Sequence, residues 1–511
     1  MKKLLIILIS VVVLAGCTKN FYDINTSPNN PTNASLDLVL ANALKTTAQG
    51  QQTGYQFLES WMGYWTASGS YACNSSDIAT YKEDNGFADG FNGGIGGNWS
   101  GYYDNLEDYD FIEKTATATN NYFYIGAAKV MKAFVFQQLV DMFNNIPYSA
   151  ALQGTSNIQP KYDDAKGIYE DLAKQLDAAV VLFQRADAVG SVTQDIVFGK
   201  YNISTTNNTQ NDKWAKFANT LKLRLLLRQT EMAGRSAYIS TEIGKILANG
   251  SGFLTVSANV NPVYSNSTGK QSPFYAYCIN TSGTYVQDYW RASTYVINYC
   301  ITNNDPRYTR WYAPITGGAY VGGAQGGCGT NAVGSLSSVF GPGLLQSVGQ
   351  DAPLLTLAES WFLQSEAALR GWLPAVNEQT AFNSGVQASF TWLGAGSSAA
   401  YTSQAGNRNT NYGACATFTE KLNCIMRQKW AANHTLFPFE TWCDYRRLFN
   451  LNLPALNGTG GIPITVHPLA EAPIKVPTRI LYPTIEVNTN LANVTAQGTI
   501  DYKSSKIFWM P

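Results

Sequence analysis

The chain has 511 residues, and its 35 lysine and arginine residues balance its 35 aspartate and glutamate residues. This balance excludes a strong overall field for nucleic acid, and no basic run would form a local nucleic-acid site. Charged residues make up only 14% of the chain and aromatic residues 13%, which predicts a surface of neutral hydrogen-bonding groups and rings. The length predicts two or three packed subregions.

The N-terminus has the pattern of a bacterial lipoprotein signal. A pair of lysines precedes an apolar segment at residues 4–14, and Leu14-Ala15-Gly16-Cys17 follows. Small residues before a cysteine, directly after such a segment, form a lipoprotein cleavage box. We predict that residues 1–16 are removed and that Cys17 carries the lipid; the alternative is an ordinary secretory signal with an accidental cysteine. Each buried methylene contributes ~0.8 kcal/mol, so several acyl chains would hold the protein durably at a membrane.

The first part of the mature chain changes from tether to helix to loop. Residues 17–34 are rich in Asn, Pro and Thr and predict a flexible tether. Helices are expected at 36–47, with Ser35 as the cap, and at 56–65. Residues 68–97 carry seven glycines between aromatic residues and predict a long loop, a kind of segment that is usually functional or disordered in compact proteins.

Residues 122–145 predict a long central helix, preceded by helical spacing at 99–114. Their apolar residues recur at three- and four-residue steps, and Pro147 ends the pattern. Lys129 and Lys132 argue against a membrane span, because each central lysine costs roughly 2.5–3.5 kcal/mol on insertion scales. We therefore expect a buried helix covered by other helices, and a mainly helical, layered protein.

The remaining chain alternates helical and irregular segments. Amphipathic patterns predict helices at 160–183, with Asp163 as the candidate cap, and at 213–228. Residues 249–350 are the least regular, with one helix expected around 286–301. Further helices are predicted at 352–372, 382–391, 417–432 and 438–449. The proline-rich tail from 450 onward is expected to wrap the body as an irregular strap.

Seven cysteines remain after Cys17, so at least one is unpaired. None has the spacing of a metal site. Buried free thiols are the favoured interpretation, and a Cys415–Cys424 bridge is the alternative.

In order and in kind, these segments resemble the SusD/RagB nutrient-binding outer-membrane lipoproteins, specifically the second large branch of that family. The resemblance covers nearly the full length. Its motifs are the lipobox, DINTSPNNP, the central helix with FNNIPY, PKYDDAKGIYEDLAKQLDAA, KWAKFANTLKLRLLLR, DPR, LLTLAESWFLQSEAALRGW, IMRQKWAANH, ETWCDYRRL and RILYPTIEVNTN.

The resemblance implies a mainly α fold, in which tetratricopeptide-like helix pairs form a right-handed superhelical scaffold beside an irregular, loop-rich, ligand-facing half. It also implies a SusC-type TonB-dependent transporter as partner, on which the lipoprotein sits as a lid at the outer membrane. Acidic residues often follow the acylated cysteine in surface-displayed members, whereas Thr18-Lys19-Asn20 follow here. Exposure to the cell exterior therefore rests on the resemblance alone.

Together these features predict an ordered set of regions. They are a signal peptide at 1–16, a lipid-anchored tether at 17–34, an N-terminal helical scaffold at 35–260 with a loop insertion at 68–97, an irregular ligand-facing region at 261–350, a C-terminal helical part at 351–450 and a wrapping tail at 451–511.

No enzyme motif is present, so we predict no catalysis, cofactor or metal. The only histidines are His434 and His467, and neither has a catalytic or zinc-binding spacing. Glu359 and Glu366 share a helix face and could form a carboxylate pair, but the resemblance implies that they are scaffold residues that bond neighbouring helices. An internal cluster of ion pairs and hydrogen bonds is expected from four further residues: Glu440, Asp444, Arg446 and Arg447.

A neutral surface rich in aromatic and amide groups suits oligosaccharides, which offer apolar C–H faces and hydroxyls, or extended peptides. Rings at helical spacing are interpreted as core: Trp99, Trp214, Trp361 and Trp430. Three further rings are interpreted as packing residues and not as ligand contacts: Trp61, Trp311 and Tyr312. Rings in irregular segments are the ligand-binding candidates: Trp65, Tyr71, Tyr81, Phe87, Phe91, Tyr277, Tyr285, Tyr289 and Trp290.

The favoured function is a non-catalytic lid that captures an oligomeric nutrient, with oligosaccharide placed above oligopeptide. A structural subunit that stabilises the transporter without touching cargo is the alternative from another class. A surface hydrolase is the third, and the sequence offers no convergent carboxylates for it.

Overall fold

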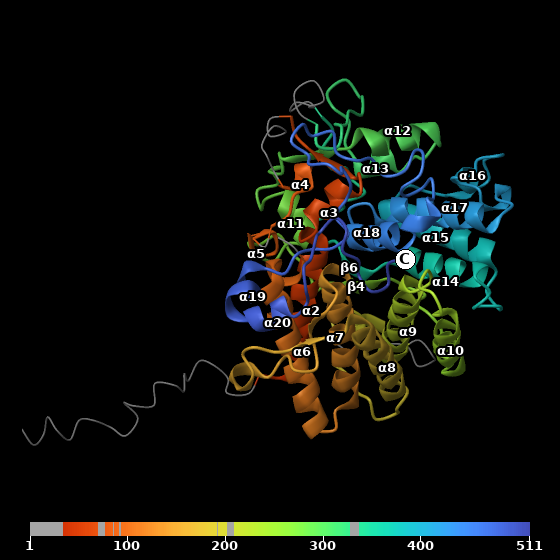
Figure 1. Ribbon diagram of the computed structural model, residues 1–511. Coiled ribbons are helices and arrows are strands. Elements are labelled where there is room, and N and C mark those ends of the chain that lie inside the picture. Colours follow the sequence, from red (N-terminus) through yellow and green to blue (C-terminus); the bar gives the residue numbers. More distant parts are fainter. Residues whose placement is uncertain are drawn as a thin grey trace, which may run out of the picture.

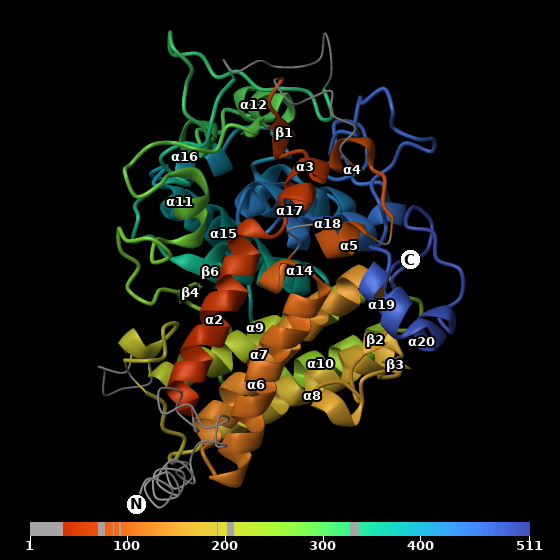
Figure 2. The same cartoon turned by 90° about the vertical axis from the view of Figure 1, so that its left-hand side faces the viewer.

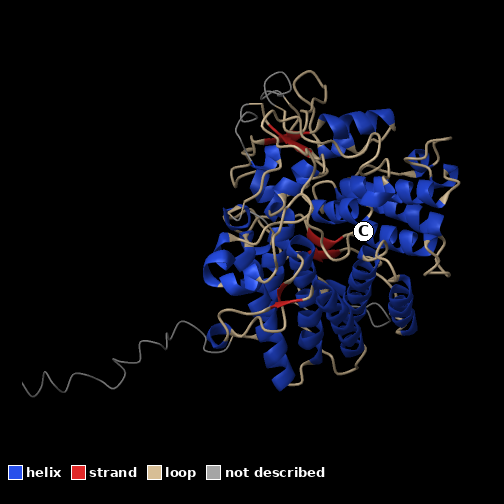
Figure 3. Cartoon of the chain, in the orientation of Figure 1, coloured by secondary structure: helices blue, strands red, loops and turns tan. Residues whose placement is uncertain are grey.

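The structure is a computed structural model that describes residues 34–69, 77–84, 86–90, 94–191, 193–201, 209–327 and 337–511 (Figure 1). Helices dominate these residues, and short strands pair into two-stranded sheets. Loops gather in the upper half of the molecule (Figure 3). The predicted mainly helical fold is confirmed. Cys17, the signal segment, most of the tether, Cys73 and Cys328 lie outside the described residues.

The lower half is a row of long helices that lie side by side (Figure 2). Within it α7 packs against α6 on one side and α8 on the other, and α8 packs against α9. Residues 119–121 form a short connection from α6 to α7, as in an antiparallel helix pair, whereas the longer segments 144–164 and 184–209 join α7 to α8 and α8 to α9. The helices are α2 (Leu36–Thr53), α6 (Trp99–Ala118), α7 (Tyr122–Phe143), α8 (Ala165–Phe183), α9 (Gln210–Arg228) and α10 (Ser236–Ala248).

The second helical group lies to the right in Figure 1 and comes from the C-terminal part of the chain. It contains α14 (Leu357–Leu369), α15 (Glu378–Leu393), α16 (Ala399–Thr402), α17 (Phe418–Asn433) and α18 (Pro438–Arg447). Short helices within the loop-rich part are α3 (Gln56–Trp61), α4 (Asp77–Thr80), α5 (Phe87–Gly90), η1 (Ile95–Gly97), α11 (Pro273–Cys278), α12 (Thr294–Thr302) and α13 (Tyr308–Trp311).

Helix α7 is buried along most of its length, as predicted for the central helix. Its single acid, Asp141, is fully buried and joins four parts of the chain. Its carboxylate accepts hydrogen bonds from the Tyr169 hydroxyl on α8, from Arg228 Nε on α9 at 3.3 Å and from the Trp509 indole at 2.7 Å. The C-terminal tail thus returns to the centre of the molecule and ends on the helix that organises it.

In the part of the chain that the structure describes, short strands form three pairs, and two of these pairs connect segments that are distant in the sequence. These pairs are β1 (Trp65–Ala67) with β5 (Trp290–Ala292), β2 (Ile146–Pro147) with β3 (Tyr162–Asp163), and β4 (Ala258–Val260) with β6 (Ala352–Leu355). Within the described residues, no helix combines the length and the hydropathy needed to cross a membrane.

The strands explain where the sequence-based boundaries were wrong. The helix expected from 352 begins only at Leu357, because residues 352–355 pair with β4. The helix expected from 286 begins at Thr294, because Trp290–Ala292 pairs with β1. The helices predicted at 213–228, 382–391, 417–432 and 438–449 are confirmed, with shifts at their ends.

Local side-chain bonding corrects two further expectations. Asp164, not Asp163, caps α8 by accepting a bond from the backbone N–H of Gly167. Asp163 instead accepts bonds from Tyr148 and Ser149 in the β2–β3 turn region. The tail is irregular as expected, except for α19 (Thr484–Thr489) and α20 (Leu491–Thr495).

The cysteines that the structure describes are free and buried, so the Cys415–Cys424 bridge does not form here. The favoured interpretation of these thiols as buried free groups is confirmed for the described cysteines. They are Cys278, Cys300, Cys415, Cys424 and Cys443.

Candidate functional site

The two irregular segments that supplied the ligand-binding candidates meet in the structure. Strand β1, at the start of the first loop, pairs antiparallel with β5 in the middle region, and Ala67 lies opposite Trp290. The Trp65 indole donates to the Thr435 hydroxyl at 3.0 Å, which ties this pair to the C-terminal helices. The two segments therefore lie side by side in the structure.

An aromatic cluster lies behind this strand pair. The Trp65 ring centroid is 4.6 Å from that of Phe340, 5.8 Å from that of Trp290 and 6.1 Å from that of Phe274. Trp65 is 2% exposed and Trp290 5% exposed, so neither ring has a free face for a ligand in this conformation. The aromatic cluster therefore serves as packing beneath the neighbouring surface residues.

Two further candidates are also buried. Tyr81 and Phe87 both pack against Trp61: Tyr81 edge-on at 6.0 Å, and Phe87 stacked at 6.1 Å. Their burial disfavours direct ligand contact. Tyr71 and Phe91 lie outside the described residues. Three candidates keep a partly exposed ring: Tyr277, Tyr285 and Tyr289.

Of these three, Tyr277 lines a hollow of about 360 Å³ between α2, η1 and α11. The other lining residues carry hydroxyl or amide side chains or are glycines, and none of them is charged. They are Thr46, Gln49, Gly50, Thr53, Gly54, Gln56, Gly94 and Gly97. We refer to these residues with Tyr277 as the Tyr277 hollow.

Tyr277 is held in place from several sides. Pro273 starts α11, and Phe274, one turn before Tyr277, anchors the helix in the aromatic cluster with its ring 6.3 Å from the Tyr277 ring. Burial raises the pKa of Tyr277, although hydrogen bonds from Trp290 and Gln56 oppose this rise. The hydroxyl therefore stays protonated and can both donate and accept a hydrogen bond.

Polar residues on α2 form the opposite wall of the hollow, and the sequence analysis missed them. Thr46, Gln49, Gly50 and Thr53 recur at three- and four-residue steps and so share one helix face. This polar stripe was the available signal. It was overlooked because the helix was expected to end at residue 47, whereas α2 continues to Thr53.

Gly50 allows α2 and η1 to approach closely beside the hollow. A Cβ atom at this position would lie 2.4 Å from Cα of Ile95. We expect Gly50→Ala to lower the free energy of unfolding by ~1–3 kcal/mol, because the backbone of η1 must move. Gly244 on α10 is the matched control, since its added Cβ would meet nothing within 4 Å.

At this control position alanine should raise the free energy of unfolding by up to ~1 kcal/mol through helix propensity. Urea denaturation of both variants measures the two effects. Equal effects of the same sign at Gly50 and Gly244 would contradict the close approach.

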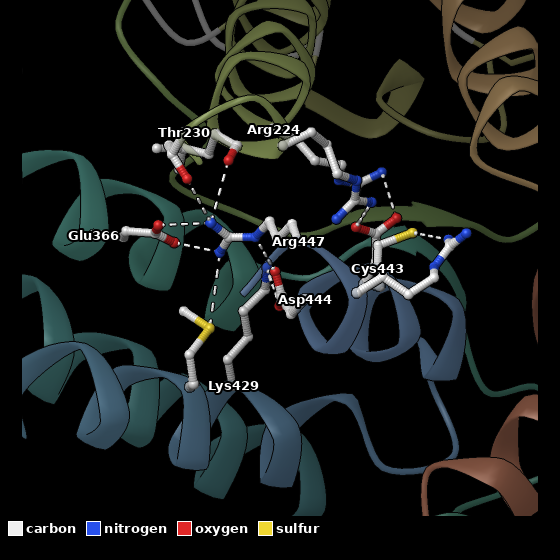
Figure 4. Close-up of polar contacts among 12 residues, drawn as sticks. Arg224, Thr230, Glu366, Lys429, Cys443, Asp444 and Arg447 are labelled. Atoms are coloured by element: carbon white, nitrogen blue, oxygen red, sulfur yellow. Dashed lines mark hydrogen bonds and ion pairs between the residues drawn. The ribbon is translucent and has the colours of Figure 1, made fainter. Parts of the chain in front are cut away.

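The acidic residues of the C-terminal helices are neutralised inside the scaffold (Figure 4). Arg447 binds both oxygens of Glu366 at 2.8 and 2.6 Å and donates to Asp444 at 2.8 Å. Arg224 binds Glu359 in the same two-point way at 2.9 and 2.8 Å. The predicted scaffold role of Glu359 and Glu366 and the predicted ion-pair cluster are confirmed.

The electrostatics of this cluster favour fixed charges. Burial alone would raise the pKa of Asp444, but Lys429 and Arg447 outweigh it and hold the pKa well below its usual range. Lys429 lies 2.9 Å from the Asp444 carboxylate. A carboxylate held ionised by two cations is a poor general acid or base at neutral pH.

The rings interpreted as core or as packing residues are placed as expected with one exception. Trp61, Trp99, Trp214, Trp311, Tyr312 and Trp430 are buried, whereas Trp361 is half-buried. Over the described ranges, no group of three or more His, Cys, Asp or Glu side chains is arranged to hold a metal ion.

Helix pairs beside a loop-rich half are the architecture of a class of outer-membrane nutrient-binding proteins. The chain belongs to the SusD-like family of this class: the family model described as starch-binding and associating with the outer membrane matches residues 28–483. The resemblance drawn from the sequence is thereby confirmed. No curated protein is detectably similar to the chain in sequence.

Solved structures agree on the fold. A SusD-like protein from Bacteroides thetaiotaomicron is 21% identical, with a TM-score of 0.72 over 93% of this chain and 99% of that one. A chitin-binding SusD homologue from Flavobacterium johnsoniae is 22% identical, with a TM-score of 0.69 over 92% and 98%. A SusD/RagB family protein from Bacteroides thetaiotaomicron is 21% identical, with a TM-score of 0.68 over 93% and 99%.

Proposed function

We propose that this protein is a non-catalytic, lipid-anchored lid that captures a neutral oligosaccharide and delivers it to a SusC-type TonB-dependent transporter in the outer membrane. The observation that carries the choice of cargo is the Tyr277 hollow, which combines a partly exposed ring with hydroxyl and amide side chains and has no charged residue among its described lining residues. Sugar rings present C–H faces to an aromatic ring and hydroxyls to amides, so this lining matches them.

The names of relatives support a glycan. A structurally similar SusD homologue binds chitin, a neutral polymer. An extended peptide needs backbone partners such as an open strand edge, whereas the walls of the Tyr277 hollow come from α2, η1 and α11. Oligopeptide therefore stands as the second cargo class.

The lipid anchor at Cys17 and the exposure on the cell exterior are part of this proposal and go beyond the family assignment. Acylation of Cys17 would attach the protein to the outer membrane, and residues 18–34 would give it reach on the cell exterior. As a lid, the protein closes on the transporter when cargo contacts both partners, because binding favours the state with more contacts. The neutralised carboxylates of the C-terminal helices support a role without bond cleavage.

Replacing Tyr277 with alanine should weaken binding of neutral oligosaccharides about tenfold, since a sugar-stacking ring is lost. Affinity electrophoresis against soluble glycans and calorimetry measure this change. Tyr275→Ala, on the same helix but outside the hollow, is the matched control and should bind normally. Equal binding by the Tyr277 and Tyr275 variants would remove the hollow from the cargo site.

The transport role is tested in cells that lack the protein. The lid hypothesis expects normal transporter abundance with reduced oligosaccharide uptake per transporter. Reduced abundance with unchanged uptake per transporter would favour a structural subunit instead. Peptides that co-purify with the protein and its transporter, detected by mass spectrometry, would favour oligopeptide cargo.

A further inference from the structure

A second cavity, of about 690 Å³, lies along helix α15 in the C-terminal part of the molecule. It shares no lining residue with the Tyr277 hollow. One face of α15 forms its longest wall, at positions that repeat every three and four residues. These wall residues are Thr380, Asn383, Ser384, Gln387, Ala388, Thr391 and Trp392.

Among the residues that the structure describes, no charged side chain lines this cavity. Leu357, Leu393, Leu436 and the buried Trp311 provide apolar surface, while α15 provides hydroxyl and amide groups. A charged ligand would lose hydration without gaining a partner, so the lining selects for neutral molecules. The volume is within the range of about 300–1,000 Å³ that is typical of small-molecule sites.

The inner wall of the cavity contains the side chain of Trp311, which is 1% exposed. Its ring is fixed, because it stacks on His434 at 4.6 Å with 13° between the planes. Trp311 is therefore a rigid, apolar part of the cavity wall.

The side chain of Trp392 also lines the cavity and is more exposed than that of Trp311. It is half-buried, and its backbone carbonyl accepts a bond from Gln346 at 2.8 Å. The loop beyond it is held by Gln387, which accepts bonds from the backbone N–H and the hydroxyl of Ser398 at 2.8 and 3.0 Å. These hydrogen bonds hold the backbone at Trp392 and the loop after it in place without a ligand.

We propose that this cavity is a second site for a short neutral oligosaccharide, with one sugar ring on Trp392 and sugar hydroxyls bonded to the hydroxyl and amide side chains of α15. The choice of ligand class rests on the proposed function, but the site itself does not. Two separated sites would let one longer chain be held at two points, which raises the effective concentration of the second contact.

Calorimetry of the full lipoprotein, in a detergent without sugar groups, tests this proposal with chitohexaose and maltoheptaose as probes. Wild type should show two sites for at least one probe. Trp392→Ala should weaken the second site about tenfold and leave the first unchanged. Tyr277→Ala should weaken the first site about tenfold and leave the second unchanged.

Two further variants control for folding. Ala388→Phe fills the cavity from its own wall and should also weaken the second site, without removing a scaffold contact. Trp372→Ala removes another half-buried indole outside the cavity and should leave both sites unchanged.

Each outcome bears on the proposal. A single site that is lost in Tyr277→Ala and kept in both Trp392→Ala and Ala388→Phe overturns the second site and leaves the proposed function standing. A single site lost in Trp392→Ala and kept in Tyr277→Ala supports the α15 cavity and removes the Tyr277 hollow from the cargo site. Absence of binding by wild type to both probes overturns both proposals.

Discussion

Replacing Asp141 with alanine should lower the free energy of unfolding by ~3–5 kcal/mol, the range for breaking a buried charged contact. The carboxylate is fully buried and is shared by α8, α9 and the C-terminal tail. Its removal leaves the Tyr169 hydroxyl and the Trp509 indole without their acceptor and leaves Arg228 with Glu440 as its remaining carboxylate. Urea denaturation followed by circular dichroism measures the loss.

Asp104→Ala is the matched control, because Asp104 is exposed on the neighbouring helix α6. It should change stability by no more than ~0.5 kcal/mol. A similarly small change for Asp141→Ala would show that the buried carboxylate does not organise the core.

The contact with the tail can be isolated by a double-mutant cycle. Trp509→Phe keeps most of the ring but removes the N–H that donates to Asp141 at 2.7 Å. Alone it should cost ~1–2 kcal/mol, and in the Asp141→Ala background much less, since the acceptor is already gone. Additive losses would mean that Trp509 stabilises the protein by packing and not through this bond.

The helices could be predicted from the sequence because their signal is local. The spacing of apolar residues defined α7, α8 and α9 before any contact was known. Helix α10 was missed although Ile239, Ile243 and Ile246 carry the same periodicity and are buried. The sequence therefore does contain a local signal for α10.

The strands and the site could not be predicted in the same way. Strands β1 and β5 have three residues each and are separated by more than 200 residues, so no local period marks their pairing. This pairing buries Trp65 and Trp290, which a position in an irregular segment had indicated as exposed. Tyr277 remained at the surface because α11 directs it toward the polar stripe of α2.

The cap of α8 was predicted at Asp163, one residue before the observed cap, Asp164. Asp163 and Asp164 are adjacent and both can cap, so the sequence alone does not distinguish them. The β2–β3 pairing decides, since it places Asp163 beside Tyr148 and Ser149 and leaves Asp164 at the start of α8. Boundaries that depend on such distant contacts are set by tertiary structure.

Acid should destabilise this protein through His434, well above the pH at which carboxylates ordinarily titrate. Burial, with a smaller contribution from Arg307, lowers the pKa of His434 from 6.5 to about 3. Its two ring nitrogens already bond to the Tyr312 hydroxyl at 2.7 Å and the Thr435 hydroxyl at 2.8 Å. The folded ring therefore stays neutral at a pH where the unfolded ring is charged.

The sign follows from proton uptake. Below pH 6.5 the unfolded chain binds a proton at His434 that the folded chain does not, so the free energy of unfolding falls as the pH falls towards 3. The slope is ~1.4 kcal/mol per pH unit, so this residue should contribute a loss of ~2 kcal/mol between pH 6.5 and 5. His434→Gln keeps a donor and an acceptor but does not titrate, and it should abolish that part of the loss.

Another buried group in this region, Glu59, changes the free energy of unfolding in the opposite direction as the pH falls. Wild type and the His434→Gln variant must therefore be compared. Burial raises the pKa of Glu59, whose carboxylate accepts a bond from the Thr435 backbone N–H at 3.3 Å. That residue stabilises the folded state as the pH falls, but it is present in both wild type and variant. The measured quantity is therefore the difference between their changes in unfolding free energy from pH 7 to pH 5. Equal changes in the two proteins would mean that His434 is already charged in the fold, and the stacked arrangement with Trp311 would then hold an imidazolium.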